Sequence, residues 1–336
     1  MKKAYLFIML IAQLSQYCWG QNLSCGTESF MEDSVTTALL HHIRQLRSYN
    51  NDTLFFRVQI HIIRNSNHYT SLNIDSLKKD FQALNEYYKP AAIHFYMCNT
   101  YNYIDDDQYY DFYHSDEAYL RNTYNDPYAV NIYLANTVHS SSNVTVAGYS
   151  YYPSANRNFV VIDYHYLRKS TLIHEVGHFF NLLHTHDNTH GYELVNGSNC
   201  AVSGDLCCDT PADPMLSYAN VNTNCEYTGT SIDANGDFYT PDPHNIMSYA
   251  RKECRDSFSS EQYERIRDAA FLPNRQILCS HHTILESGAV TSDTTITNDY
   301  VIIDNYYMSA DSIKIDACAE ILLNSSVTLH KGVILQ

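Results

Sequence analysis

Basic residues are scarce in this sequence. Lys and Arg together number 21 against 37 Asp and Glu, which gives a formal net charge of −16 over 336 residues. An acidic surface repels phosphate backbones and anionic lipid headgroups, so the composition argues against a nucleic-acid partner and against binding to an acidic membrane. The hydrophobic fraction of 45% and the charged fraction of 17% are typical of a globular chain with an ample core.

Long hydrophobic runs are also lacking. The apolar run 4–14 falls short of the roughly 20 residues that span a bilayer, and no other segment is longer and comparably apolar. This run follows Lys2 and Lys3 and precedes Trp19-Gly20, so we expect residues 1–20 to be a signal peptide. A lipid-modified Cys18 or Cys25 is an alternative, which the preceding residues, Tyr17 and Ser24, disfavour. We therefore expect the mature protein to be secreted or attached to the cell surface.

Cysteines are numerous, and several gather in one region. Of ten cysteines, nine remain after removal of the signal peptide, and five of them lie between residues 200 and 254. In an exported chain such a cluster predicts disulfides. An all-cysteine zinc site is the alternative, but the spacings do not form two short CxxC pairs.

Strand and helix patterns alternate along the first half of the chain. Strands are expected at 54–63, 92–98, 129–134, 144–152 and 159–164, and helices at 35–46, 73–88, 105–123 and 259–272. This alternation predicts an α/β (α+β) domain with a twisted, mixed and mostly parallel sheet. Tyrosine, present 30 times against one tryptophan, suits half-buried strands and cleft walls.

Two later regions have a different character. Residues 187–245 are rich in Asn, Asp, Gly and Cys without periodicity, and such a long irregular stretch is usually cross-linked or functional. Asp205, Asp209 and Asp213 offer hard oxygens for a structural calcium ion, although ordinary loop carboxylates are the alternative. Residues 281–336 carry short apolar runs that predict a β-rich segment for attachment or sorting. Its pattern still runs at Gln336, which suggests that the segment is incomplete.

The strongest motif in the sequence is HEVGH at residues 174–178. On a helix His174 and His178 point the same way, so both imidazoles can bind one zinc ion, while Glu175 is placed to hold a water. If the chain bends after Asn181, His184 becomes a third ligand. Three protein nitrogens leave one tetrahedral position open, which is the arrangement of a catalytic zinc. A helix with an exposed ion pair is the alternative.

The motifs around this helix resemble a known peptidase group. HEVGHFFNLLH is similar to the HExxHxxGxxH signature of metzincin metallopeptidases, and NIMSY at 245–249 resembles their methionine turn. VAGYSYYP, FVVIDY and GDLCCDTPADP narrow the resemblance to the pappalysin (cytophagalysin-like) family over residues 50–280. The resemblance implies a zinc endopeptidase in which Met247 lies beneath the metal and Tyr249 supports the reaction intermediate. Asn181 departs from the signature glycine but tolerates the positive φ expected there.

The resemblance also implies where substrate binds. The strand 146–152, with Ala147, Gly148 and Tyr149, is expected to pair with extended substrate, and a core strand is the alternative. Glu253, after the methionine turn, is expected to wall a pocket that favours basic side chains.

Further expectations from the resemblance concern cysteines. They are that Cys200 pairs with Cys225, and that Cys254 pairs with Cys208 or Cys207.

Cys25 lies in a polar segment, residues 21–50, that looks like a propeptide. Its thiolate is expected to block the zinc, as in latent metzincins, with a disulfide to Cys98 or Cys279 as the alternative. Arg44 and Arg47 are then candidate sites for activating cleavage.

The sequence therefore predicts a secreted zinc endopeptidase that acts on proteins or peptides, with a catalytic domain at 51–280. Two other functions remain open. One is an inactive, adhesive relative, against which the intact Glu175 argues. The other is a zinc amidase for non-peptide substrates, which only substrate testing separates.

Overall fold

A computed structural model describes residues 23–29, 34–46, 52–97, 101–168 and 170–279 together with six strands between 282 and 329. The predicted signal peptide, Arg47, Cys98 and the run 333–335 lie outside the described residues.

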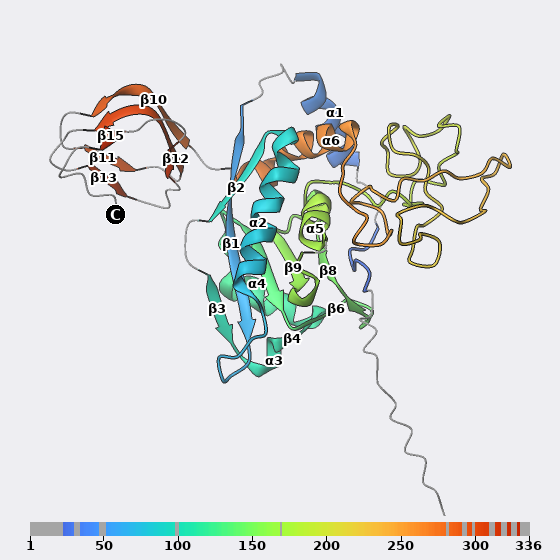
Figure 1. Cartoon of the computed structure of the whole chain (residues 1–336), viewed down its shortest axis with the longest axis horizontal. Helices are drawn as coiled ribbons and strands as arrows, with labels where there is room; N and C mark the ends of the chain where they lie inside the picture. The colour runs from blue at the N-terminus through green and yellow to red at the C-terminus, as the bar shows by residue number, and fades with distance from the viewer. Residues whose placement is uncertain are drawn as a thin grey trace, which may run out of the picture.

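A six-stranded, mixed sheet organises the main body (Figure 1). Its central order is β2-β1-β5-β9-β8, with β3 also paired to β1. All of these pairs are parallel except β8–β9, so β8 is an antiparallel edge strand. The strands are β1 (Leu54–Arg64), β2 (Ile93–Met97), β3 (Asn102–Asp105), β5 (Val130–Ala135), β8 (Gly148–Ser150) and β9 (Phe159–Asp163).

Helices on one face of this sheet enclose the larger core. They are α2 (Ile74–Tyr88), α5 (Thr171–Phe179) and α6 (Ser260–Ala270), with α1 (Ser34–Leu46) lying beside α6 and the short α7 (Pro273–Gln276) following it (Figure 1). Helix α2 begins where the Asn73 side chain accepts the amide of Ser76, and α6 begins with a capping box between Ser259 and Gln262. These caps confirm both helix starts that the sequence predicts.

The other face is covered by smaller elements, and here the predictions were partly wrong. Residues 105–123 do not form one helix but α3 (Asp107–Tyr110), strand β4 (Asp111–Tyr113) and α4 (Glu117–Tyr124). Strand β4 pairs with the unpredicted β6 (Thr137–His139), so part of this stretch belongs to a small second sheet. The strand predicted at 144–152 is divided at Ala147 into β7 (Thr145–Val146) and β8, because β7 joins that second sheet while β8 joins the main one.

The C-terminal apolar runs form parallel strands, drawn as a group apart from the main sheet in Figure 1. They are β10 (His282–Val290), β11 (Thr294–Thr297), β12 (Tyr300–Met308), β13 (Ile313–Asp316), β14 (Ile321–Leu323) and β15 (Thr328–Leu329). No helix among the described residues has the length and apolar character needed to cross a membrane.

Candidate metal centre and active site

Three histidines converge at the end of α5. His174 and His178 are one turn apart on this buried helix. The helix ends because Asn181 adopts a φ of 69°, the left-handed conformation expected for it, and the chain then returns His184 to the same point. The Nε2 atoms lie 3.2 Å apart for His174 and His178, 3.3 Å for His174 and His184, and 3.0 Å for His178 and His184.

Backbone carbonyls orient two of these imidazoles. His174 Nδ1 donates to the carbonyl of Ile246 and His178 Nδ1 donates to the carbonyl of Leu182, each over 2.7 Å. A protonated Nδ1 leaves the Nε2 lone pair free for a metal. Tetrahedral ligands at about 2.0–2.1 Å from an ion are roughly 3.3 Å apart, so the spacing of the three nitrogens fits a metal ion.

Burial keeps these histidines neutral, which is the form that binds metals. It lowers the pKa of His174 and His184 well below the usual value and that of His178 to about 4. Burial has the opposite effect on the carboxyl group of Glu175 and raises its pKa to about 7, against hydrogen bonds from Cys25 and Thr27 that lower it. Glu175 Oε1 is buried without a hydrogen-bond partner, so one carboxylate oxygen is left for a further ligand.

The methionine turn packs beneath the histidines. The Met247 side chain is fully buried, and a Cβ atom at Gly177 would lie only 2.7 Å from its Sδ atom. Gly177 is therefore required for the helix to approach this turn. The ring of Tyr249 lies 4.7 Å from that of His184, and its hydroxyl donates to the carbonyl of Cys25 over 3.1 Å.

The segment around Cys25 occupies this centre. The Cys25 Sγ atom lies 3.5 Å from His178 Nε2 and 3.4 Å from Glu175 Oε2. Cys25 and the three histidines are the one group of three or more His, Cys, Asp and Glu residues able to hold a metal within the part of the chain that the structure describes. Cys25 and Cys279 are both free thiols, so the alternative bond between them is not formed.

The same segment pairs with the exposed edge of β8. The amide of Gly26 donates to the carbonyl of Gly148, and the amide of Ala147 donates to the carbonyl of Ser24, both over 2.8 Å. The side chain of Tyr149 does not face the metal centre, because its hydroxyl donates to buried Glu117. The backbone of β8, and not the Tyr149 side chain, is thus available to an extended chain beside α5.

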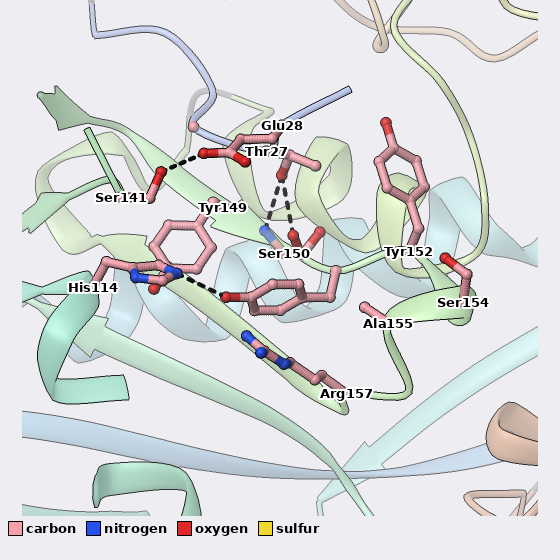
Figure 2. A pocket seen from close by; sticks show the side chains of 12 residues that line it. Thr27, Glu28, His114, Ser141, Tyr149, Ser150, Tyr152, Ser154, Ala155 and Arg157 are labelled. Carbon is pink, nitrogen blue, oxygen red and sulfur yellow. Dashed lines mark hydrogen bonds between the residues drawn. The ribbon is translucent and has the colours of Figure 1, made fainter. Parts of the chain in front are cut away.

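A cavity of about 590 Å³ lies along β8 and is lined by Gly26, Thr27 and Glu28 on its other side. Figure 2 shows Thr27 and Glu28 reaching across it toward Ser150 and Ser141. The hydroxyl of Thr27 accepts the amide of Ser150 and donates to Glu175 Oε2 over 3.0 Å. Ser150 in turn donates through Oγ to the carbonyl of Glu175. The roles of Thr27 and Ser150 beside Glu175 were not predicted, since an isolated Thr or Ser carries no motif.

The disulfides correct the predicted pairing. The four cysteines are those expected, but Cys200 bonds to Cys208 and Cys225 bonds to Cys254. Turns between residues 197 and 208 bring the Cα atoms of Cys200 and Cys208 to 5.0 Å, whereas Cys225 packs with Val221 against Cys254. Local turns therefore decide the partners, and Cys207 remains a buried free thiol.

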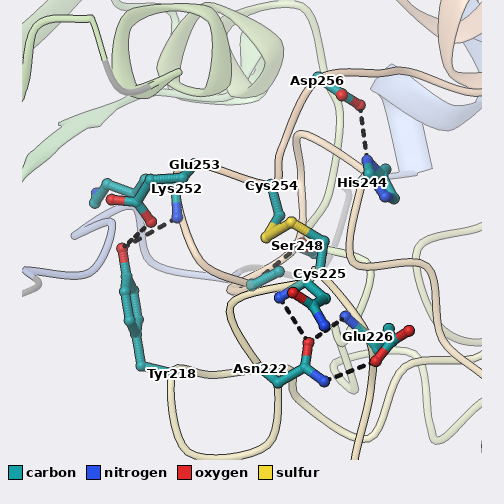
Figure 3. Close-up of a disulfide and its surroundings, with 12 residues drawn as sticks. Tyr218, Asn222, Cys225, Glu226, His244, Ser248, Lys252, Glu253, Cys254 and Asp256 are labelled. Atoms are coloured by element: carbon teal, nitrogen blue, oxygen red, sulfur yellow. Dashed lines mark hydrogen bonds and ion pairs between the residues drawn. A yellow bond between two sulfur atoms is a disulfide. The ribbon is translucent and has the colours of Figure 1, made fainter.

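Glu253 lines a cavity together with Leu172 and Ile173 of α5, and not the cavity beside Tyr249. Its side chain is exposed and accepts a hydrogen bond from the hydroxyl of Tyr218, as Figure 3 shows. A cavity beside Cys25 and Tyr249 is lined instead by Lys252 and Arg255. The cavity next to Tyr249 therefore has no acidic wall, and the preference for basic side chains expected from Glu253 stays a prediction.

The three candidate calcium ligands do not form a cluster. Asp205 accepts from Thr210, Asp213 accepts from Thr185, and Asp209 accepts the amide of Glu261. Each carboxylate thus has a separate role in the loops, so these residues are ordinary loop carboxylates and do not share one calcium site.

Comparisons with known proteins agree with this geometry. The family profile described as pregnancy-associated plasma protein-A matches residues 113–270, which include the HEVGH helix and the methionine turn. An extracellular metalloprotease of Pyricularia oryzae is 24% identical over 294 residues, covering 79% of this chain and 94% of that protein. Residues 113–270 therefore match the pappalysin family of metalloproteases.

Two further proteins are similar to this chain. An extracellular metalloprotease of Aspergillus fumigatus is 34% identical over 111 residues, which is 32% of this chain and 29% of that protein. A solved structure of a Tannerella forsythia promirolysin mutant superimposes with a TM-score of 0.51 at 18% identity, over 76% of this chain and 97% of the other. That likeness concerns the fold.

Proposed function

We propose that this metalloprotease is an exported zinc endopeptidase that is made as a latent precursor. The observation that carries the proposal is the convergence of three neutral imidazoles, from His174, His178 and His184, which would hold the ion. Three histidines and a nearby cysteine form a set of ligands that suits zinc. When bound, zinc would polarise the scissile carbonyl and make a nucleophile of water at neutral pH.

Glu175 is proposed as the general base and acid. It follows the first histidine, is buried, and has one oxygen without a protein partner. In this role Glu175 takes a proton from the attacking water and passes it to the leaving nitrogen. Thr27 donates to the other oxygen in the precursor, and this contact would be lost when the leader segment departs.

Tyr249 and Met247 are proposed to support the reaction from below. The Tyr249 hydroxyl donates to a carbonyl oxygen in the precursor, that of Cys25. In the active enzyme it would donate instead to the substrate carbonyl, where negative charge develops. Met247 would keep α5 and its histidines in position through its contact with Gly177.

Residues 21–50 are proposed as a propeptide, following a signal peptide at 1–20. Cys25 places its sulfur where a fourth ligand would lie, and residues 24–26 take the edge of β8 that an extended substrate would use. Helix α1 fastens this leader to the rest of the chain, because Arg44 binds Asp268 over 2.8 Å. Cleavage of the leader would then expose a catalytic domain at 51–280, with residues 281–336 serving attachment or sorting.

Casein hydrolysis by the processed protein tests the proposal. We expect activity that o-phenanthroline abolishes and zinc restores, with about one zinc per chain by elemental analysis. Glu175→Ala should lower the rate by about two to four orders of magnitude while zinc remains bound. Glu253→Gln, which changes an exposed carboxylate, is the control. Activity that survives both chelation and Glu175→Ala would refute the mechanism.

The same assay tests latency. The unprocessed chain should be inactive and its Cys25→Ala variant active, whereas Ser24→Ala should stay latent. If the unprocessed Cys25→Ala variant is as inactive as the unprocessed wild-type chain, the Cys25 thiol does not cause the latency.

A further inference from the structure

The cavity beside Tyr249 is positively charged. It measures about 300 Å³ and adjoins Cys25 on one side, with Lys252 and Arg255 on another. Its remaining walls are largely apolar or hydroxylated, and none of its lining residues is acidic; they are Leu23, Ser24, Met215, Leu216, Ser217, Tyr218, Ala219, Tyr249 and Ala250. The cavity therefore offers cations, and no carboxylate, to a group that enters it.

Arg255 is the unusual member of this set. Only 6% of it is exposed, and its Nη1 atom donates to the carbonyl of Ser248 over 3.0 Å. Its Nε and Nη2 atoms are buried and have no hydrogen-bond partner. A buried cation with unpaired donors destabilises a fold unless a ligand completes it. Two donors of Arg255 are thus left for something that the protein itself does not supply.

The two unpaired nitrogens have the geometry that recognises a carboxylate. Nε and Nη2 form one side of the guanidinium fork, which binds both oxygens of a carboxylate at once. Arg64 shows this pairing in the same protein: its Nε and Nη2 atoms donate to the two oxygens of Asp105 over 2.6 and 2.8 Å. Arg255 presents the same side of its fork without the carboxylate.

The position of Arg255 is held by its surroundings. It follows Cys254, whose disulfide to Cys225 packs with Leu216 and Ala250 next to the cavity (Figure 3). Lys252 is oriented separately, with its Nζ atom 3.5 Å from the hydroxyl of Thr171 and 4.9 Å from the centre of the Tyr166 ring. The fork therefore sits on a cross-linked loop and does not depend on a mobile surface side chain.

The leader segment crosses this cavity but supplies no acidic group to Arg255. Leu23 and Ser24 line the cavity immediately before Cys25, yet neither offers a carboxylate. A chain that replaces the leader would place a side chain, or its own end, at the same position. An acidic group there would satisfy both donors of Arg255 at once, through charge-assisted hydrogen bonds.

We propose that Arg255 makes this cavity a carboxylate-binding pocket, so that the peptidase cleaves next to an acidic residue of its substrate. The inference rests on the proposed endopeptidase function and differs from the preference for basic side chains expected from Glu253. The carboxylate has two possible sources, the side chain of Asp or Glu and the free C-terminus of a peptide. The shared chemistry is a carboxylate held by a guanidinium fork.

Quenched-fluorescent peptides test the proposal with the processed, zinc-loaded full-length enzyme. A series carries Glu, Gln, Ala or Lys on either side of one cleavable bond, with the C-terminus amidated. We expect Glu at one of these positions to raise kcat/KM over Gln by at least about tenfold, as charge-assisted hydrogen bonds do. Equal cleavage of the Glu and Gln peptides, or a preference for Lys, would overturn the proposal.

A second arm separates the sources of the carboxylate. Peptides without acidic residues are compared as free acids and as amides, with the cleavable bond near the C-terminus. Faster cleavage of the free acids, without a Glu preference in the internal series, would assign the pocket to chain ends and overturn the side-chain preference.

Variants link the preference to Arg255. Arg255→Gln should reduce the preference for Glu to within about twofold, and Arg255→Lys should retain part of it, because charge remains while the fork is lost. Glu253→Gln should leave the preference intact. If Arg255→Gln does not fold, the peptide preferences of the wild-type enzyme and of the Arg255→Lys variant still test the proposal. Casein that stays uncleaved would indicate failure of the endopeptidase function and not of the pocket.

Discussion

The two sides of the cleft are built in different ways. One side consists of β8 and α5, which belong to the sheet and to its buried core. The other side comes from residues 180–259, all of which the structure describes, and it contains no helix and only isolated β-bridges. Two disulfides and many polar turns hold that second side. Hydrophobic burial thus orders the metal-binding helix and Met247, which share one core, whereas a disulfide cross-links the loop that carries Arg255.

The largest effect that distinguishes the two sides should come from the Cys225–Cys254 disulfide. It closes a loop with a sequence separation of 29, against 8 for Cys200–Cys208. Loop-closure entropy then predicts a loss in unfolding free energy of about 3.5 kcal/mol for the Cys225→Ser/Cys254→Ser variant and about 2.5 kcal/mol for Cys200→Ser/Cys208→Ser. Urea unfolding followed by circular dichroism measures both.

The same variants probe the site. The first variant should also weaken cleavage selectivity, because Arg255 adjoins Cys254, and retain zinc, because His174 and His178 lie on α5. Equal losses of zinc from both variants would show that the two sides of the cleft are not independent.

The comparison also explains what the sequence could predict. Helices α2 and α6 followed from their apolar spacing and caps, and β1, β5 and β9 followed from runs of buried side chains. The bend after Asn181 followed from the spacing between His178 and His184, and its left-handed conformation followed from the glycine at this position of the metzincin signature. These features depend on local patterns that are complete within a few residues.

The features that were wrong or missed depend on tertiary contacts. Cys200 had several partners within reach, and only the turns around it select Cys208. Glu253 and Arg255 are two residues apart, and nothing local decides which of them faces the cavity. Thr27 reaches Glu175 across the fold, and such a contact has no sequence signature.

A smaller effect is expected where the two sides touch, at Gly177 and Met247. Gly177→Ala would place a Cβ atom 2.7 Å from Met247 Sδ, so the packed side chain must shift. We expect a loss of about 1–2 kcal/mol in unfolding free energy, because overpacking outweighs the gain in helix propensity. A double-mutant cycle with Met247→Ala checks the cause, since the double variant should lose less than the sum of the two single losses. Strict additivity would mean that this contact does not join the helix to the turn.

The smallest effect is expected at Asn181, where the chain leaves the ordered helix for the irregular side. Its φ of 69° disfavours residues with a Cβ atom, and Asn tolerates this conformation better than Ala. Asn181→Ala should lower the unfolding free energy by about 1 kcal/mol, whereas Asn181→Gly should cost less because glycine adopts this φ freely. The bond from Arg265 Nε to the Asn181 carbonyl is available in both variants, so urea unfolding compares the backbone conformations directly. If Ala and Gly were tolerated equally, the left-handed turn would not be what limits residue choice between the two sides of the cleft.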